Sequence, residues 1–245
     1  MPRTARKRSE AGIYHVMLRG INRQQIFIND EDAGYFLALL KEYQSAGCFV
    51  LYAYCLMGNH VHILLKAEND PLSVIMKRIG VRYVMHFNAK YDRIGHLFQD
   101  RYKSEPVDSD SYFLTVLRYI HNNPVKAGLC EKPEDYPLSS ARGYLLGDGI
   151  ADASFAENIT GKKELAAFLQ QKNDDVCLDD STARVSDNAA SKYICKLCSV
   201  KQPADCLGLA QEQLALYIPA MKKAGLSMHQ ISRLTGVPFG IVRKY

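Results

Sequence analysis

The sequence contains no hydrophobic run long enough to cross a membrane, and this argues against a membrane-spanning protein. The basic N-terminal arm, residues 1–8, is not followed by the apolar stretch of a secretory signal. The seven cysteines are odd in number and mostly scattered through apolar segments, which indicates reduced thiols. We therefore expect a cytoplasmic protein with no membrane partner.

A complete zinc-binding pattern is also missing. Cys195, Cys198 and Cys206 are spaced like part of a zinc knuckle, but no fourth ligand lies at close spacing. The sequence leaves both a zinc site and free thiols open here, and it favours free thiols.

Acidic residues are absent from the end of the chain. Residues 213–245 contain five lysines and arginines and no acid, whereas residues 146–212 contain 11 acidic and seven basic residues. The whole chain carries a formal net charge of +5. A basic C-terminal segment and a basic N-terminal arm fit a polyanionic partner such as DNA.

Hydrophobic periodicity and turn signals predict an alternating order of strands and helices. The expected elements are a strand at 12–18, a helix at 30–47, strands at 49–57 and 60–66, a helix at 71–88, a strand within 98–107, and a helix from 109 to 123 that Pro124 ends. This order predicts an α+β fold, a ferredoxin-like antiparallel sheet with helices on one face. We expect this domain to span residues 1–150, followed by an acidic linker with some helices at 151–210.

The remaining residues, 211–245, form a small all-α segment by pattern. Ser227 and Gln230 resemble a capping box, and the turn Thr235-Gly236-Val237 precedes a short basic helix containing Arg243 and Lys244. This indicates a helix-turn-helix that binds DNA. The alternative is a helical hairpin that packs on the first domain.

Two histidines stand out in the apolar run Gly58-Asn59-His60-Val61-His62-Ile63-Leu64-Leu65. Because side chains alternate along a strand, His60 and His62 point to the same face. Two adjacent imidazoles make half a metal site. Spacing alone leaves open that they are ordinary strand histidines.

A second polar pair lies in the run Arg118-Tyr119-Ile120-His121-Asn122-Asn123. Tyr119 and Asn123 are four residues apart and share one helix face. The Asn123 amide oxygen could be a third ligand beside two imidazoles, and that mixed set suits Mg²⁺ or Mn²⁺. A phenol near such an ion could act as a nucleophile on a phosphate. The alternative is that Tyr119 packs in the core.

Together these motifs carry a resemblance. His60-Val61-His62 resembles the histidine–hydrophobe–histidine (HUH) motif, and the downstream Tyr-Ile-x-x-Asn-Pro-Val-Lys-Ala-Gly-Leu pattern follows in the expected order. From about Tyr14 to Tyr144 the chain is similar to single-tyrosine HUH transposases of the insertion-sequence type. It looks closest to the REP-associated tyrosine transposases.

The resemblance implies a bacterial, nucleoid-associated enzyme that cleaves and rejoins single-stranded DNA next to hairpins or palindromic repeats, through a covalent 5′-phosphotyrosine. Tyr119 would be the nucleophile, and His60, His62 and Asn123 would bind Mg²⁺ or Mn²⁺. Residues expected to grip the hairpin are Arg3, Arg6, Lys7, Arg8, Arg19, Asn22 and Arg23. The C-terminal segment, residues 211–245, would add duplex contacts through Arg233, Arg243 and Lys244.

Two other readings stay open at this point. The chain could be a catalytically silent, regulatory DNA-binding protein, or a metal-dependent phosphodiesterase that uses water. Mobile relatives form homodimers and domesticated ones act as monomers; the resemblance to the latter favours a monomer.

Overall fold

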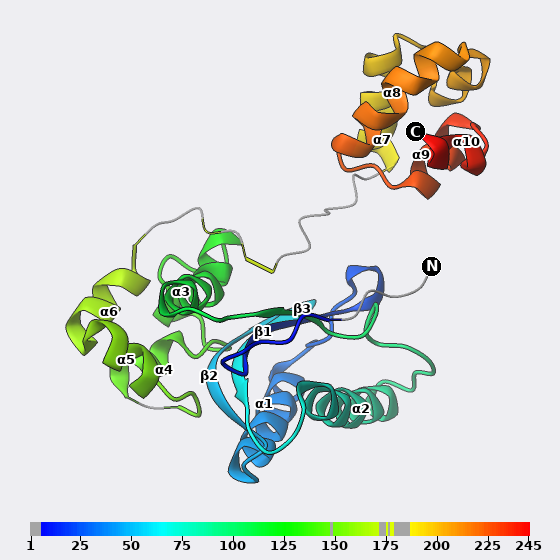
Figure 1. The fold of residues 1–245 in the computed structure, drawn as a ribbon. Coiled ribbons are helices and arrows are strands. Elements are labelled where there is room, and N and C mark those ends of the chain that lie inside the picture. Colours follow the sequence, from blue (N-terminus) through cyan, green and yellow to red (C-terminus); the bar gives the residue numbers. More distant parts are fainter. Residues whose placement is uncertain (1–5, 148, 172–174, 176, 179–186) are drawn as a thin grey trace. The chain divides into compact units, whose positions relative to one another are not determined.

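The computed structural model describes residues 6–147, 149–171, 175, 177–178 and 187–245. The chain divides into two compact units, Met1–Leu178 and Asp179–Tyr245. Figure 1 shows that the first unit combines a sheet with helices and that the second is helical. Within the described residues, no helix is both long and apolar enough to span a membrane.

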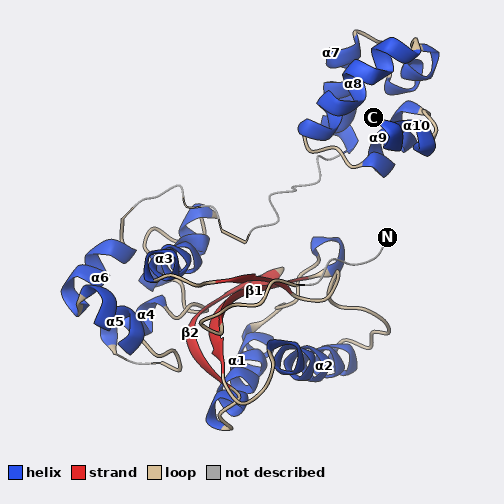
Figure 2. Ribbon diagram, in the orientation of Figure 1, coloured by secondary structure: helices blue, strands red, loops and turns tan. Residues whose placement is uncertain are grey.

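A four-stranded antiparallel sheet lies at the centre of the first unit, with the order β2-β3-β1-β4 (Figure 2). The strands are β1 (Ile13–Arg19), β2 (Phe49–Met57), β3 (His60–Ala67) and β4 (Lys103–Pro106). All three neighbouring pairs are antiparallel. The predicted α+β class and its antiparallel sheet are therefore confirmed.

One face of the sheet packs against α1 (Asp30–Ser45) and α2 (Leu72–Lys90). Alternate residues of the central strands, among them Val16 of β1 and Ile63 of β3, are fully buried in this core. The helix α1 begins as the sequence suggests, because the Asn29 side chain caps it in a reciprocal capping box.

The other face is also covered by helices, and in this respect the expectation of helices on one face needs correction. The helices on this side are α3 (Asp110–Lys126), α4 (Ala141–Leu146), α5 (Ser154–Thr160) and α6 (Lys162–Leu169) (Figure 1). The strand β2 explains the difference, since eight of its nine residues are buried without alternation. Such a strand is apolar on both faces and needs a layer on each side.

The expectation that Pro124 ends its helix is wrong, because α3 continues to Lys126. Proline removes one N–H donor, but its backbone angle is compatible with the last turn of a helix. The N–H of Ala127 still donates to the carbonyl of Asn123 at 3.0 Å, and the helix ends before Gly128, whose φ is +70°. This extra turn keeps Asn123 inside the helix, on the face of α3 that carries Tyr119.

The second unit contains α7 (Asp187–Cys198), α8 (Gln211–Lys223), α9 (Met228–Thr235) and α10 (Phe239–Lys244), with a short 3-10 helix at Pro203–Gly208. Its core contains Ile194, Ile218, Ile231 and Val242, one from each helix, together with Cys198 and Cys206. As the sequence indicates, Ser227 caps α9, and Gly236 at φ +73° makes the turn toward α10.

The segment 151–210, expected to be a linker, is divided between the two units. α5 and α6 belong to the first unit, where Ala156, Leu165 and Leu169 are buried in the core that they share with α3. α7 belongs to the second unit. The sequence placed its boundaries at 150 and 210 because the segment is polar, whereas its few apolar residues are sufficient to anchor short helices.

The loop after β1 requires glycine at position 20. A Cβ atom there would lie 2.3 Å from the Gln24 carbonyl oxygen and 2.9 Å from a methyl group of Ile26. We expect Gly20→Ala to lower the free energy of unfolding by about 1–3 kcal/mol in urea denaturation. Gly34→Ala is the matched control, because Gly34 is exposed in α1 with open space around it. It should raise stability by about 0.4–1 kcal/mol; equal stability of Gly20→Ala and the wild type would contradict this.

The buried carboxylate of Asp32 joins α1 to the end of α2. It accepts hydrogen bonds from the Ile28 N–H at 2.9 Å, the Lys90 ammonium at 2.8 Å and the Tyr91 hydroxyl at 2.7 Å. Burial by itself raises the pKa of Asp32, but the hydrogen bonds outweigh it and hold the pKa below its usual value.

Asp32 therefore predicts an acid-sensitive contribution to stability. Its pKa is lower folded than unfolded, so the contribution is complete above the unfolded value of about 3.9 and is lost as pH falls through the folded value. We expect Asp32→Asn to lower the free energy of unfolding by about 2 kcal/mol at pH 7. Urea denaturation between pH 3 and pH 7 should show a smaller acid loss in Asp32→Asn; parallel curves would exclude this role.

Candidate active site

His60 and His62 lie at the start of β3, directly after the turn formed by Gly58 and Asn59. They share the face that packs against α3, and the residues between and after them point into the α1–α2 core. Their ring centroids are 5.1 Å apart. His62 is completely buried and His60 is partly exposed, with its Nδ1 atom 2.6 Å from the Asn59 side-chain oxygen.

The electrostatic environment keeps His62 neutral. Burial lowers the pKa of His62 well below its usual value, and the neighbouring His15, His60 and Arg19 lower it further. Its Nδ1 atom lies 2.9 Å from Nε2 of His15. Its own Nε2 atom is buried and has no hydrogen-bond partner among the described groups. A neutral imidazole with an unused ring nitrogen is the form in which histidine binds metal ions.

Tyr119 of α3 meets the histidines on this face. Its ring centroid lies 5.5 Å from that of His62 and 5.9 Å from that of His15, and the residue is 4% exposed. The ammonium of Lys126, two turns along the helix, is 5.4 Å from the Tyr119 ring centroid. Tyr119 is thus a core residue by burial and a site residue by position, so the two readings of the sequence are not exclusive.

Asn123 lies one helical turn after Tyr119 and is half-buried. Within the described residues, no group of three or more His, Cys, Asp or Glu side chains is placed to hold a metal ion. A metal site at His60 and His62 therefore needs a ligand of another kind, and the amide of Asn123 is of that kind. The unused His62 nitrogen and the imidazole–amide donor set are compatible with a divalent metal ion.

Sequence reasoning missed two residues of this site, His15 and Glu105. His15 of β1 is completely buried, and its Nδ1 atom lies 2.7 Å from a carboxylate oxygen of Glu105 on β4. Burial raises the pKa of Glu105, but hydrogen bonds from His15 and the Leu178 N–H lower it below its usual value. A signal was present, because His15 interrupts the apolar strand Ile13-Tyr14-His15-Val16 just as His60 and His62 interrupt β3.

The loop expected to grip DNA lies at the same end of the sheet. Arg19 ends β1, is paired in register with His60 and is half-buried. Asn22 and Arg23 are exposed, with φ of 51° and 59°. The side chain of Asn59 donates to the Arg23 carbonyl at 3.4 Å, so this loop lies beside the β2–β3 turn.

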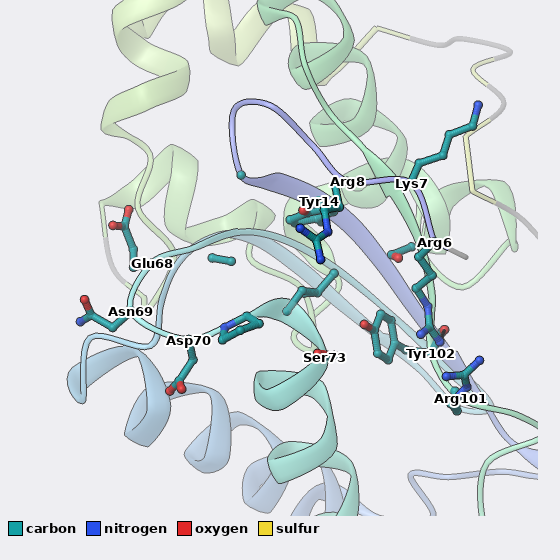
Figure 3. Close-up of a pocket in the computed structure, with 15 residues that line it drawn as sticks. Arg6, Lys7, Arg8, Tyr14, Glu68, Asn69, Asp70, Ser73, Arg101 and Tyr102 are labelled. Atoms are coloured by element: carbon teal, nitrogen blue, oxygen red, sulfur yellow. Dashed lines mark hydrogen bonds between the residues drawn. The ribbon is translucent and has the colours of Figure 1, made fainter. Parts of the chain in front are cut away.

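The described end of the N-terminal arm borders a groove of about 880 Å³ (Figure 3). Arg3 lies outside the described residues, whereas Arg6, Lys7 and Arg8 line the groove. The Arg6 guanidinium donates to the Tyr102 carbonyl at 2.8 Å and stacks 4.0 Å from the centre of its ring. The opposite wall carries Glu68, Asn69 and Asp70. The groove is therefore basic on one side only.

The basic residues of the second unit differ in their surroundings. Arg233 of α9 forms an ion pair with Asp187 at 2.8 Å. Arg243 and Lys244 of α10 are exposed. Of the three residues expected to contact a duplex, Arg233 is thus partly neutralised within its own unit.

Comparisons with known proteins agree with this geometry. Residues 9–123 match the family described as "Transposase IS200 like". A Haemophilus influenzae protein described as a REP-associated tyrosine transposase is 29% identical, over 47% of this chain and 76% of that protein. The solved structure of a REP-associated tyrosine transposase bound to a REP hairpin has a TM-score of 0.52 and 16% identity, over 73% of this chain and 96% of that one. Residues 9–123 therefore match the IS200-like transposase family, and the resemblance stated from the sequence is confirmed.

Proposed function

We propose that the first unit cleaves and rejoins single-stranded DNA through a covalent 5′-phosphotyrosine at Tyr119, with Mg²⁺ or Mn²⁺ held by His60, His62 and Asn123. The observation that carries this proposal is the position of Tyr119. Its ring lies 5.5 Å from His62, whose Nε2 atom is buried and without a described partner. A potential nucleophile and a potential metal ligand thus lie side by side.

The chemistry is a pair of transesterifications. The Tyr119 hydroxyl oxygen forms a bond to the scissile phosphorus, the bond from phosphorus to the 3′ oxygen breaks, and the phenolic proton is lost while the 3′ oxygen gains one. In the reverse sense, a 3′-hydroxyl attacks the phosphotyrosine and releases Tyr119. One phosphodiester replaces another in each step, so no nucleotide cofactor is required. When bound, the divalent ion would polarise the scissile phosphate.

Two basic features of the first unit support a DNA substrate. Arg6, Lys7 and Arg8 line the groove of Figure 3, and Arg23 is exposed beside the turn that precedes His60. Basic side chains beside an aromatic ring, such as Arg6 over Tyr102, are suited to a phosphate backbone and its bases. The solved relative is described as bound to a REP hairpin, and a hairpin is accordingly the substrate we propose.

The test of the nucleophile is the covalent adduct. Labelled single-stranded hairpin DNA is incubated with the full chain and Mg²⁺ or Mn²⁺, and the adduct is measured on a denaturing gel. We expect Tyr119→Phe to reduce adduct formation by at least about 1000-fold, because the attacking oxygen is removed. Tyr35→Phe is the matched control, since Tyr35 is stacked on His86 in the α1–α2 layer. Chelation of the metal should abolish the adduct in both wild type and control.

The outcomes separate the alternatives. Cleavage that persists in Tyr119→Phe would indicate a phosphodiesterase that uses water. Hairpin binding without any adduct in the wild type would indicate a silent DNA-binding protein, a reading favoured by the low exposure of Tyr119 at 4%.

We further propose that the second unit binds duplex DNA through the exposed cations of α10. Replacing Arg243 and Lys244 with Ala should weaken duplex binding at all sequences and reduce the slope of log K against log salt by about 2, one for each lost phosphate contact. Lys222→Ala with Lys223→Ala at the end of α8 is the charge-matched control. If the slope of log K against log salt is the same in the two double variants, the exposed cations of α10 do not contact the duplex.

A further inference from the structure

Three residues on adjacent strands form a continuous polar chain under α3. Glu105 of β4 and His15 of β1 are direct partners in the strand register, and His62 of the next strand, β3, is a diagonal neighbour of His15, being paired with Met17. The Glu105 carboxylate lies 2.7 Å from Nδ1 of His15, and Nε2 of His15 lies 2.9 Å from Nδ1 of His62. Both histidines are completely buried.

The hydrogen-bonding chemistry of Glu105, His15 and His62 determines which ring nitrogen carries the proton in each histidine. An ionised carboxylate only accepts hydrogen bonds, so the proton of a neutral His15 is on Nδ1 and its Nε2 accepts. His62 must then donate from its own Nδ1, which leaves the lone pair on Nε2. That Nε2 atom is the one that is buried without a partner among the described groups.

The carboxylate is itself held in place. The backbone N–H of Leu178 donates to the same oxygen of Glu105 at 2.9 Å. The Glu105 side chain is 24% exposed, so it is the accessible end of an otherwise buried chain.

From this geometry we propose that Glu105 and His15 are positioning residues that fix the tautomer and ring orientation of His62, so that its Nε2 lone pair is directed to a divalent cation. The inference rests on the proposed function, because it assumes that His62 is a metal ligand. Second partners of this kind hold metal-binding histidines in one orientation and raise their affinity for the ion. Burial of the two polar rings of His15 and His62 costs stability, and two apolar side chains in their place would not carry this cost.

The first experiment measures metal affinity in the full chain without DNA. Isothermal titration with Mn²⁺ is compared among the wild type, His62→Ala, Glu105→Ala and Glu105→Gln. We expect Glu105→Ala to weaken Mn²⁺ binding about 10- to 100-fold. Glu105→Gln should recover part of this loss, because its amide oxygen can still accept the His15 proton. The control is Glu42→Ala, which removes an exposed carboxylate of α1 that pairs with Arg82 of α2. This variant should bind Mn²⁺ like the wild type.

The second experiment observes the protons without metal. Imidazole ¹⁵N chemical shifts of the metal-free full chain should show His15 and His62 each protonated on Nδ1. In Glu105→Ala, the tautomer of His62 protonated on Nε2 should gain population. A purely structural role for Glu105 would leave these shifts unchanged.

The outcomes distinguish the inference from the function it rests on. If the wild type binds no more Mn²⁺ than His62→Ala, the proposed metal site is overturned and the inference with it. If the wild type and Glu105→Ala bind Mn²⁺ equally well, only the inference is overturned. A proton on Nε2 of His62 in the metal-free wild type also overturns the inference alone. Glu105 is partly exposed, so its variants test the proposal even if a variant of buried His15 fails to fold.

Discussion

The antiparallel register of β1 against β3 is the constraint on which the site depends. It pairs Met17 with His62 and Arg19 with His60, and so places His15 on the same face of the sheet as both β3 histidines. Because the side-chain period of a strand is two, a slip by one residue would turn the histidines into the apolar core under α1 and α2. The fully buried residues on that side, such as Val61 and Ile63, make such a slip costly.

The second layer of helices converts this polar face into a site. α3 lies over β2 and β3, and its apolar residues are buried together with those of β2; Phe113, for example, meets Tyr52 edge to face at 5.1 Å. The same packing sets Tyr119 against His62 and removes water from both. In such surroundings a hydrogen bond is stronger and an unpaired polar group costs more. In the series Glu105–His15–His62, burial strengthens the two hydrogen bonds and makes the unpartnered Nε2 atom of His62 costly.

The two units carry their positive charge on different structural elements. The first presents the exposed Arg23 beside the turn that precedes His60, and cations of its N-terminal arm line a separate groove, so this positive charge lies outside the buried core of the site. The second has a small apolar core of its own, and two exposed cations at the end of α10. Attraction of a polyanion and chemistry on a single phosphate would thus involve different residues.

The sequence by itself determined the strands and the helices α1, α2 and α3 of the first unit, the shared face of His60 and His62, and the shared helix face of Tyr119 and Asn123. These depend on local periodicity and capping, which a single chain displays directly. Tertiary structure decided what local patterns do not contain: the second helical layer over β2, the anchoring of α5 and α6, and the contact of His15 with Glu105 and His62. All three join residues that are far apart in the sequence. For His15, Glu105 and His62, strand pairing brings the side chains within hydrogen-bond distance.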